Sequence, residues 1–243
     1  MAAAELLLID LSNSYVKLAT SSREALGRVR RFPTSELGVK MLHKLQAETV
    51  VLCSVVPEKE KFLLHYFRNR KIIRVSHKTN LGVGIDFPKP QSIGADRLAN
   101  AAAAGALYGA PCVVVDFGTA VTFDILSPNR EYVGGVIAPG LEVMTDYLYQ
   151  RTALLPKIDL SEPVSVIGKS TKEAMLAGAV FGYRGLVREI LGEIREKLGV
   201  KKLRAVATGG YAELISRNLP EITAVHPHLT LEGLRIIAGL QAI

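Results

Sequence analysis

Two short stretches of the sequence place an aspartate at the end of an apolar run and follow it with small residues. The first is DLSNSYVK at residues 10–17, after ELLLI, and the second is DFGTAVTFD at residues 116–124, after CVVV. Small residues let a ligand approach backbone N–H groups closely, and a strand-end carboxylate can hold a divalent metal. The phosphates of a nucleotide need both. One such stretch is common in ordinary hairpins, but two together favour phosphate binding.

A third stretch, GADR at residues 94–97, opens an Ala-rich run. Aspartate is favourable in the first turn of a helix because it lies at the positive end of the helix dipole. A kinase also needs a carboxylate near the attacking hydroxyl group, and Asp96 is a candidate for this general base. Two glycine motifs, GGVIAPG at 134–140 and ATGG at 207–210, each end a strand before a helix. Glycine there either permits close approach of a ligand or simply separates the two elements.

The elements that carry these stretches alternate between strands and helices. Strands are predicted at residues 5–10, 15–20, 26–32, 49–53, 72–75, 112–116, 120–126, 131–138 and 203–208. Helices are predicted at residues 35–47, 58–69, 95–107, 140–150, 171–198, 210–217 and 230–241. The Gly- and Pro-containing segment 76–92 predicts a loop. Because each half begins with a strand, an aspartate turn and two more strands, we interpret the chain as a diverged internal duplication.

Composition bounds the class of protein. Hydrophobic residues make up 49% of the 243 residues, which favours a compact fold over disorder. The net charge of +7 comes from scattered lysines and arginines, so it fits small anionic ligands and makes a nucleic-acid binder the weakest alternative. Cys53 and Cys112 lie in apolar runs and predict buried reduced thiols, and the first residues lack a signal-peptide pattern. We therefore expect a cytoplasmic protein with no membrane or nucleic-acid partner.

Six motifs in order give the chain a resemblance to the type III pantothenate kinases, members of the sugar-kinase, heat-shock-chaperone and actin superfamily. The motifs are DLSNSYVK, GADR, DFGTAVTFD, GGVIAPG, IGKST and ATGG, and they span nearly the whole chain. The resemblance implies an α/β fold of two ribonuclease-H-like domains, residues 1–108 and 109–243, with the active site in the cleft between them. It also implies a homodimeric transferase that phosphorylates pantothenate with ATP, the first step of coenzyme A biosynthesis.

The resemblance also implies a role for each matching residue. Asp96 would be the general base that takes the proton of the pantothenate hydroxyl. Asp10 would lie near Mg²⁺, and Asp116 would bind a monovalent cation, K⁺ or NH₄⁺. Contacts with ATP would come from Asp10, Leu11, Ser12, Asn13, Ser14, Tyr15, Val16, Lys17, Thr119, Gly209 and Gly210. Contacts with pantothenate would come from Phe87, Gly94, Ala95, Asp96, Arg97 and Thr171.

Three positions depart from the family pattern. Ser12 replaces a glycine, and a left-handed backbone at this position would cost roughly 1–2 kcal/mol. Ser14 replaces a threonine. Phe87 replaces a tyrosine, and loss of one hydroxyl hydrogen bond typically costs about 0.5–1.5 kcal/mol. These departures leave two alternatives open: a kinase for a related hydroxyl substrate, or a nucleotide-binding member that acts as a regulatory or interaction protein.

Overall fold

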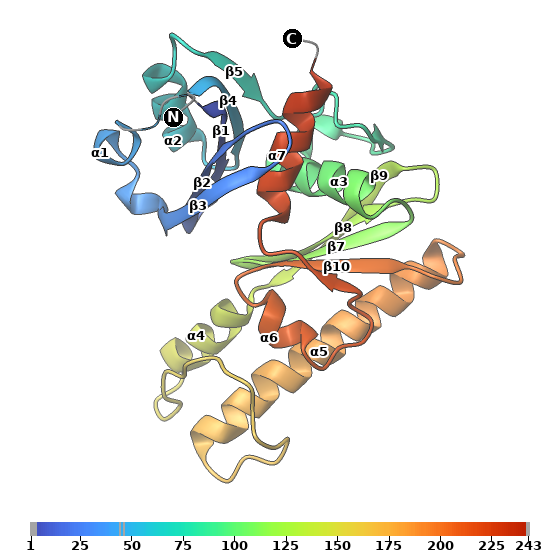
Figure 1. The fold of residues 1–243 in the computed structure, drawn as a ribbon. Coiled ribbons are helices and arrows are strands. Elements are labelled where there is room, and N and C mark those ends of the chain that lie inside the picture. The colour runs from blue at the N-terminus through green and yellow to red at the C-terminus, as the bar shows by residue number, and fades with distance from the viewer. Residues whose placement is uncertain (1–3, 44, 46, 242–243) are drawn as a thin grey trace. The chain divides into compact units, whose positions relative to one another are not determined.

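The computed structural model describes residues 4–43, 45 and 47–241, which fall into two compact units. Unit 1 comprises residues 1–110, 129–134 and 228–243, and unit 2 comprises residues 111–128 and 135–227. The C-terminal helix α7 (Leu229–Leu240), red in Figure 1, belongs to unit 1 together with the N-terminal part of the chain. The predicted domain ranges, 1–108 and 109–243, stay a prediction. The two units are groups of segments that pack together, which is a different definition from a domain boundary.

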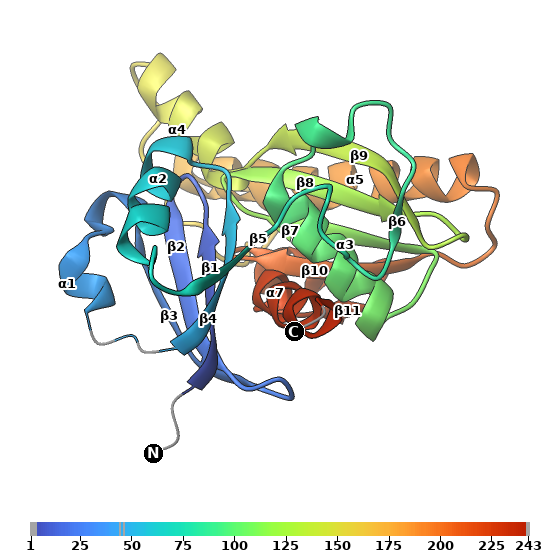
Figure 2. The same ribbon diagram turned by 90° about the horizontal axis from the view of Figure 1, so that it is seen from above.

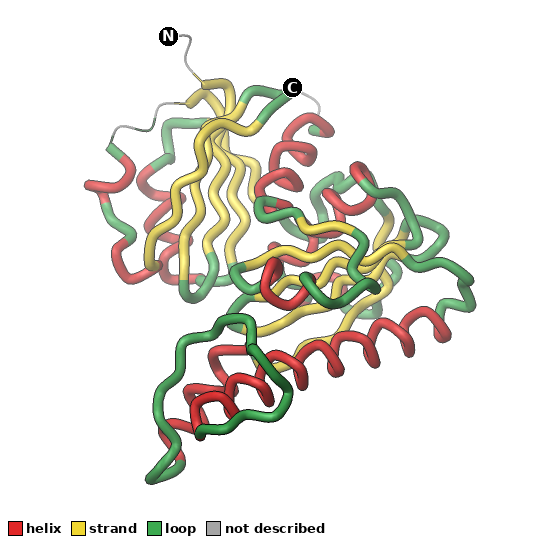
Figure 3. Tube along the Cα trace, turned by 60° about the horizontal axis from the view of Figure 1, so that its bottom comes forward, coloured by secondary structure: helices red, strands yellow, loops and turns green. Residues whose placement is uncertain are grey.

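Unit 1 is built on a five-stranded sheet. Its strands are β1 (Ala4–Leu11), β2 (Tyr15–Ser21), β3 (Leu26–Pro33), β4 (Ala47–Ser54) and β5 (Lys71–Arg74), in the order β3-β2-β1-β4-β5. Figure 3 shows these strands side by side. The central strand β1 pairs antiparallel with β2 and parallel with β4. It is a nearly continuous apolar run because both of its faces are buried.

Helices cover both faces of this sheet. On one face, α1 (Val39–Leu42) and α2 (Pro57–Tyr66) pack on Leu7 and Ile9. On the other face, α3 (Ala95–Leu107) and α7 pack on Leu6 and Leu8. Figure 2 shows α3 and α7 next to each other, and a side chain at Gly233 would place its Cβ 2.0 Å from the Ala99 carbonyl oxygen. The small residues of α3 therefore serve close helix packing.

Unit 2 repeats the same sheet topology. Its strands are β7 (Cys112–Phe117), β8 (Ala120–Leu126), β9 (Glu131–Pro139, whose first residues belong to unit 1), β10 (Arg204–Gly209) and β11 (Ala224–Val225). The sheet that they form also carries β6 (Gly84–Ile85) at its edge beside β9, and apart from this added strand its order, β9-β8-β7-β10-β11, matches β3-β2-β1-β4-β5. Helices α5 (Thr171–Lys197) and α6 (Ala212–Ser216) and the start of α4 (Leu141–Arg151) share one core with β7, β8 and β10. The matching order supports the predicted internal duplication.

Most predicted elements are confirmed to within a few residues, but the helix predicted at 35–47 is wrong. Among the residues described in this range, the chain forms a short 3₁₀ turn at Thr34–Glu36 and the single helical turn α1, and β4 already begins at Ala47. Residues 44 and 46 lie outside the described residues. Gly38 is extended between them, with φ −165° and ψ 178°, and this conformation breaks the helix. The predicted loop 76–92 also contains the two-residue strand β6 (Gly84–Ile85), which pairs with the start of β9, and a 3₁₀ turn at Pro90–Ser92. None of the helices in the described residues is long and apolar enough to span a membrane.

Candidate functional site

The first turn, residues 10–17, is the hairpin between β1 and β2. Its aspartate, Asp10, is only 3% exposed. The Ser12 hydroxyl donates to Asp10 Oδ1 over 3.1 Å, and Lys17 Nζ lies 3.6 Å from Oδ2. The Ser12 N–H donates to the Tyr15 carbonyl over 3.1 Å, while residues 13–15 are exposed. The turn therefore combines a fixed, nearly buried carboxylate with an open loop, an arrangement that suits phosphate groups and a metal held largely by water.

The serine at position 12 fits this loop without backbone strain. Among the described residues, Arg130 is the one non-glycine residue with a positive φ, so Ser12 does not adopt the left-handed conformation. The steric cost considered from the sequence therefore does not arise. The serine hydroxyl instead orients the carboxylate of Asp10.

The predicted general base, Asp96, lies in the first turn of α3. Its Oδ1 accepts the Arg97 backbone N–H over 2.8 Å. A Cβ at Gly94 would lie only 2.5 Å from the same oxygen, which explains the glycine of GADR. Burial raises the pKa of the Cys53 thiol, and the nearby charges of Asp10 and Asp96 raise it further. Cys53 lies opposite Asp10 in the register of β4 and β1, and its raised pKa keeps the thiol protonated.

Two predicted pantothenate contacts lie around a tyrosine that sequence analysis missed. Tyr132 is fully buried, and its ring centroid lies 6.2 Å from that of Phe87. The Arg97 guanidinium carbon lies 5.7 Å from the Tyr132 ring centroid. Gly134, with φ +122°, would bring a Cβ to 3.5 Å from the Phe87 ring. The only sequence signal for Tyr132 is its position two residues before the glycines of GGVIAPG.

The second turn, residues 116–124, joins β7 to β8. One glycine from each of the two glycine motifs lies against it. The Gly140 N–H donates to the Thr119 carbonyl oxygen over 3.1 Å, and a Cβ at Gly140 would lie 2.2 Å from that oxygen. Gly209 has φ +92°, and its Cβ would lie 2.6 Å from Asp116 Oδ1. Thr119 and Gly210 are exposed. The glycines at 140 and 209 are therefore required by close approach and are not mere breaks between elements.

The last predicted contact, Thr171, is the first residue of α5 and is exposed. The Ser170 hydroxyl caps the helix by accepting the Glu173 N–H over 3.2 Å, while Glu173 Oε2 accepts the Lys169 N–H over 2.7 Å. The loop before this cap is tied to α5 by Glu162 and Arg184, whose closest atoms are 2.7 Å apart. The hydrogen bonds from Arg184 hold the pKa of Glu162 below its ordinary value. The structure thus fixes the start of α5, and contact of Thr171 with substrate stays a prediction.

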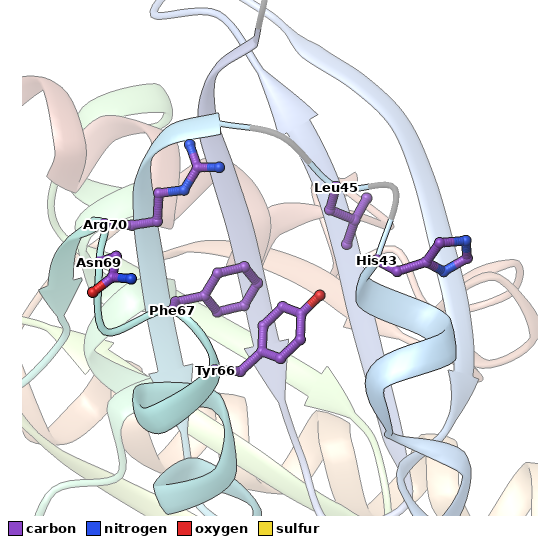
Figure 4. Close-up of a pocket in the computed structure, with 6 residues that line it drawn as sticks. All are labelled: His43, Leu45, Tyr66, Phe67, Asn69 and Arg70. Carbon is purple, nitrogen blue, oxygen red and sulfur yellow. The ribbon is translucent and has the colours of Figure 1, made fainter.

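A pocket of about 320 Å³ also lies in unit 1. Figure 4 shows its lining residues, which are His43, Leu45, Tyr66, Phe67, Asn69 and Arg70. The Arg70 guanidinium donates to the Ala47 carbonyl oxygen over 2.8 Å, so this cation already has a backbone partner. None of the six is a predicted site residue, so the pocket lies apart from the residues predicted to bind ATP and pantothenate.

The donor set fits a metal that is held only partly by protein. Among the residues that the structure describes, no three His, Cys, Asp or Glu side chains form a metal-binding group. Mg²⁺ in kinases usually takes one or two carboxylates together with water and substrate phosphates. A single carboxylate at Asp10, fixed beneath an open loop, fits this mode.

Comparison with known proteins identifies the family and supports the fold. The family model for type III pantothenate kinase matches residues 6–193. A type III pantothenate kinase from Akkermansia muciniphila is 53% identical over 243 residues, covering 96% of this chain and 98% of that protein. A Baf family transcriptional activator from Campylobacter jejuni has a TM-score of 0.61 at 19% identity, covering 96% of this chain and 97% of that one. A polyphosphate/ATP-glucomannokinase from Arthrobacter has a TM-score of 0.50 at 16% identity, covering 98% and 100%.

The two solved structures carry information about the fold alone, because their sequence identities are low. Together with the matching strand orders, they confirm the predicted α/β fold with two ribonuclease-H-like halves. The location of the active site and the roles of individual residues stay predictions. The family model and the Akkermansia relative each cover most of the sequence. The chain therefore belongs to the type III pantothenate kinase family.

Proposed function

We propose that the protein transfers the γ-phosphoryl group of ATP to pantothenate, giving 4′-phosphopantothenate in the first step of coenzyme A biosynthesis. Family membership supports this reaction. The observation that carries it furthest is the carboxylate of Asp96, which the Arg97 N–H orients at the start of α3. A Cβ at the preceding Gly94 would lie 3.6 Å from Val55, whose N–H donates to the Leu11 carbonyl of the first turn. A proton acceptor and a phosphate turn in the same part of unit 1 are what transfer to a hydroxyl group requires.

In this reaction Asp96 takes the proton of the pantothenate primary hydroxyl as the hydroxyl oxygen attacks the γ-phosphorus. The bond between the γ-phosphorus and the β,γ-bridging oxygen breaks, and ADP leaves. The Arg97 N–H holds one carboxylate oxygen in place, so the base is oriented before substrate binds. Asp10 would hold Mg²⁺ and Lys17 would contact the phosphates, and the metal would supply neutralisation of the charge that develops on them. No covalent nucleophile is needed, and burial raises the pKa of Cys112 to about 12, which keeps this thiol inert.

We further propose that the second turn contributes Thr119 and Gly210 to ATP binding and Asp116 to a K⁺ or NH₄⁺ site. Gly209 would set the geometry of that site, since its missing Cβ leaves room for the Asp116 carboxylate. Phe87, Gly94, Ala95, Arg97 and Thr171 would contact pantothenate. Phe87 lacks the phenol hydroxyl of the usual family residue, and its ring packs against the ring of Tyr132.

A homodimer in the cytoplasm completes the proposal. Unit 2 exposes large apolar side chains on α4 and on the loop before α5 that water solvates poorly. They include Val143, Tyr147, Leu148, Leu154, Val164 and Ile167, and the last three are 89%, 106% and 73% exposed. A second copy of the chain would bury such a surface.

A steady-state assay with ATP, Mg²⁺, K⁺ and pantothenate tests the proposed reaction, with phosphopantothenate detected by mass. We expect product from the wild type, a fall in kcat of about 10²- to 10⁴-fold in Asp96→Asn, and lower activity when Na⁺ replaces K⁺. Wild-type protein that binds ATP and makes no phosphopantothenate would contradict the proposal. Turnover of another small alcohol would then indicate a related kinase, and binding without any turnover would indicate a regulatory role.

A further inference from the structure

Four side chains form a row across the sheet of unit 1. The register pairs Asp10 of β1 with Cys53 of β4 and with Lys17 of β2, and it pairs Lys17 with Arg31 of β3. Residues directly opposite each other in neighbouring strands point to the same face of a sheet. Cys53 packs in the core formed with α3 and α7, so all four side chains lie on the face of the sheet that these two helices cover. We call Cys53, Asp10, Lys17 and Arg31 the polar row.

Arg31, at the edge of the polar row, is exposed but not loosely placed. Its guanidinium carbon lies 3.6 Å from the centroid of the Tyr15 ring, within the first turn itself. Stacking on an aromatic face restrains the planar guanidinium and leaves the N–H groups at its edge available for hydrogen bonding. An oriented guanidinium is well suited to bind phosphate oxygens in pairs.

The charge of the polar row also favours an anionic ligand. Lys17 lies 3.6 Å from the carboxylate of Asp10, so these two charges largely compensate each other. Arg31 adds a second positive charge at the same end of the sheet. A polyphosphate bound at the first turn would therefore meet a net positive row, even before a metal is counted.

The end of β3 is fixed to the first turn by Thr34 as well. The Thr34 hydroxyl donates to the Ser12 carbonyl over 2.7 Å, and the Thr34 N–H donates to the Ser14 carbonyl over 3.0 Å. Thr34 is 6% exposed, so these bonds are shielded from water. They hold the chain that carries Arg31 at a constant position relative to the loop.

From this geometry we propose that Arg31 is a phosphate-binding residue for ATP, in addition to the residues of the first turn. The inference rests on the proposed assignment of the first turn to ATP. Arg31 belongs to no phosphate motif and reaches the site only through the register of β2 and β3. Its N–H groups would donate to the nucleotide's phosphate oxygens beside Lys17, whose charge is partly compensated by Asp10.

The test compares Arg31→Gln with Arg30→Gln. Arg30 is also exposed and carries the same charge on the same strand, but it pairs with Leu18, so it points to the opposite face. For Arg31→Gln we expect the Kd for MgATP, measured by calorimetry, and the KM for ATP to rise about tenfold or more. The KM for pantothenate should change little. Arg30→Gln should stay within about twofold of wild type in all three constants, since its side chain points away from the nucleotide.

Two more measurements separate phosphate binding from folding. Thermal unfolding of each variant reports whether loss of the Tyr15 stack destabilises the sheet. Arg31→Lys should recover part of the affinity because it keeps the charge while losing the planar pair of donors. Equal Kd values for MgATP in Arg31→Gln, Arg30→Gln and wild type would overturn the inference. Calorimetry needs no turnover, so it tests the role of Arg31 separately from the proposed reaction. If Arg31→Gln weakens MgATP binding but the wild type does not phosphorylate pantothenate, only the proposed reaction is contradicted.

Discussion

The two aspartate turns occupy equivalent places in matching sheets but are held in different ways. The first turn depends on side chains, since Ser12 and Lys17 hold Asp10 and Thr34 bonds to the loop carbonyls. The second turn depends on missing side chains, since Gly140 and Gly209 let the backbone approach Thr119 and Asp116. A hydrogen bond can be lost at moderate cost, whereas a close backbone contact has no room for another atom. The second turn should therefore tolerate substitution less well.

The largest effect is expected for Gly140→Ala. The new Cβ would lie 2.2 Å from the Thr119 carbonyl oxygen, so the backbone of the second turn must move. We expect the free energy of unfolding to fall by about 1–3 kcal/mol and kinase activity to be largely lost, measured by urea unfolding and by steady-state assay. Gly178→Ala in α5 is the control, because the new Cβ would meet no atom within 4 Å beyond the neighbouring backbone of its own helix, and helix propensity favours alanine. Equal stability of the two variants would contradict the account.

Glu162→Gln shows whether unit 2 also contains a region held by side chains. The Arg184 side chain is 4% exposed and that of Glu162 is 27% exposed, so breaking the pair should cost about 1–3 kcal/mol at neutral pH. Because folding lowers the pKa of Glu162, the wild type loses this stability as pH falls below the ordinary value of 4.5.

Urea unfolding at several pH values should therefore show wild type and Glu162→Gln converging in acid. Glu58→Gln is the control, since it breaks an exposed pair with Lys61 and should cost less than about 0.5 kcal/mol. A constant difference between wild type and Glu162→Gln at every pH would show that the ion pair is not the cause.

Thr34→Val tests the side-chain support of the first turn. It removes the hydroxyl donor to Ser12 and keeps the backbone donor to Ser14. We expect a loss of about 1 kcal/mol in the free energy of unfolding and a higher KM for ATP, with pantothenate affinity nearly unchanged. Thr34→Ser keeps the hydroxyl and should restore the KM for ATP. If both variants behave alike in the assay, the hydroxyl does not position the loop.

The smallest effect is expected for Ser12→Gly, which restores the usual family residue. Because Ser12 is not left-handed, glycine relieves no strain; it adds flexibility and removes the hydroxyl group that donates to Asp10. Stability should fall by about 0.5–1 kcal/mol, and the ATP affinity should not improve. Tighter ATP binding by this variant, measured by calorimetry, would mean that the serine side chain crowds the phosphates.

Local patterns are sufficient to locate the elements that carry the candidate site where these are contiguous in sequence. Both turns, the start of α3 at Ala95 and the two glycine motifs could be located because each depends on a few neighbouring residues. Arg31 and Tyr132 could not, since strand pairing brings them next to distant segments. Thr34 could not either, since it reaches the first turn by hydrogen bonds to Ser12 and Ser14. The helix predicted at 35–47 failed for a related reason, because an extended Gly38 interrupts an otherwise helical pattern.

The central claim is that each aspartate turn binds phosphate, and calorimetry of MgATP binding to Asn13→Ala and Thr119→Ala tests it most directly. Both side chains are exposed, one in each turn, so neither substitution should disturb the fold. The account predicts that each variant binds MgATP about twofold to tenfold more weakly than wild type, which is the loss expected for one hydrogen bond. Wild-type affinity in either variant would contradict the assignment of that turn to phosphate.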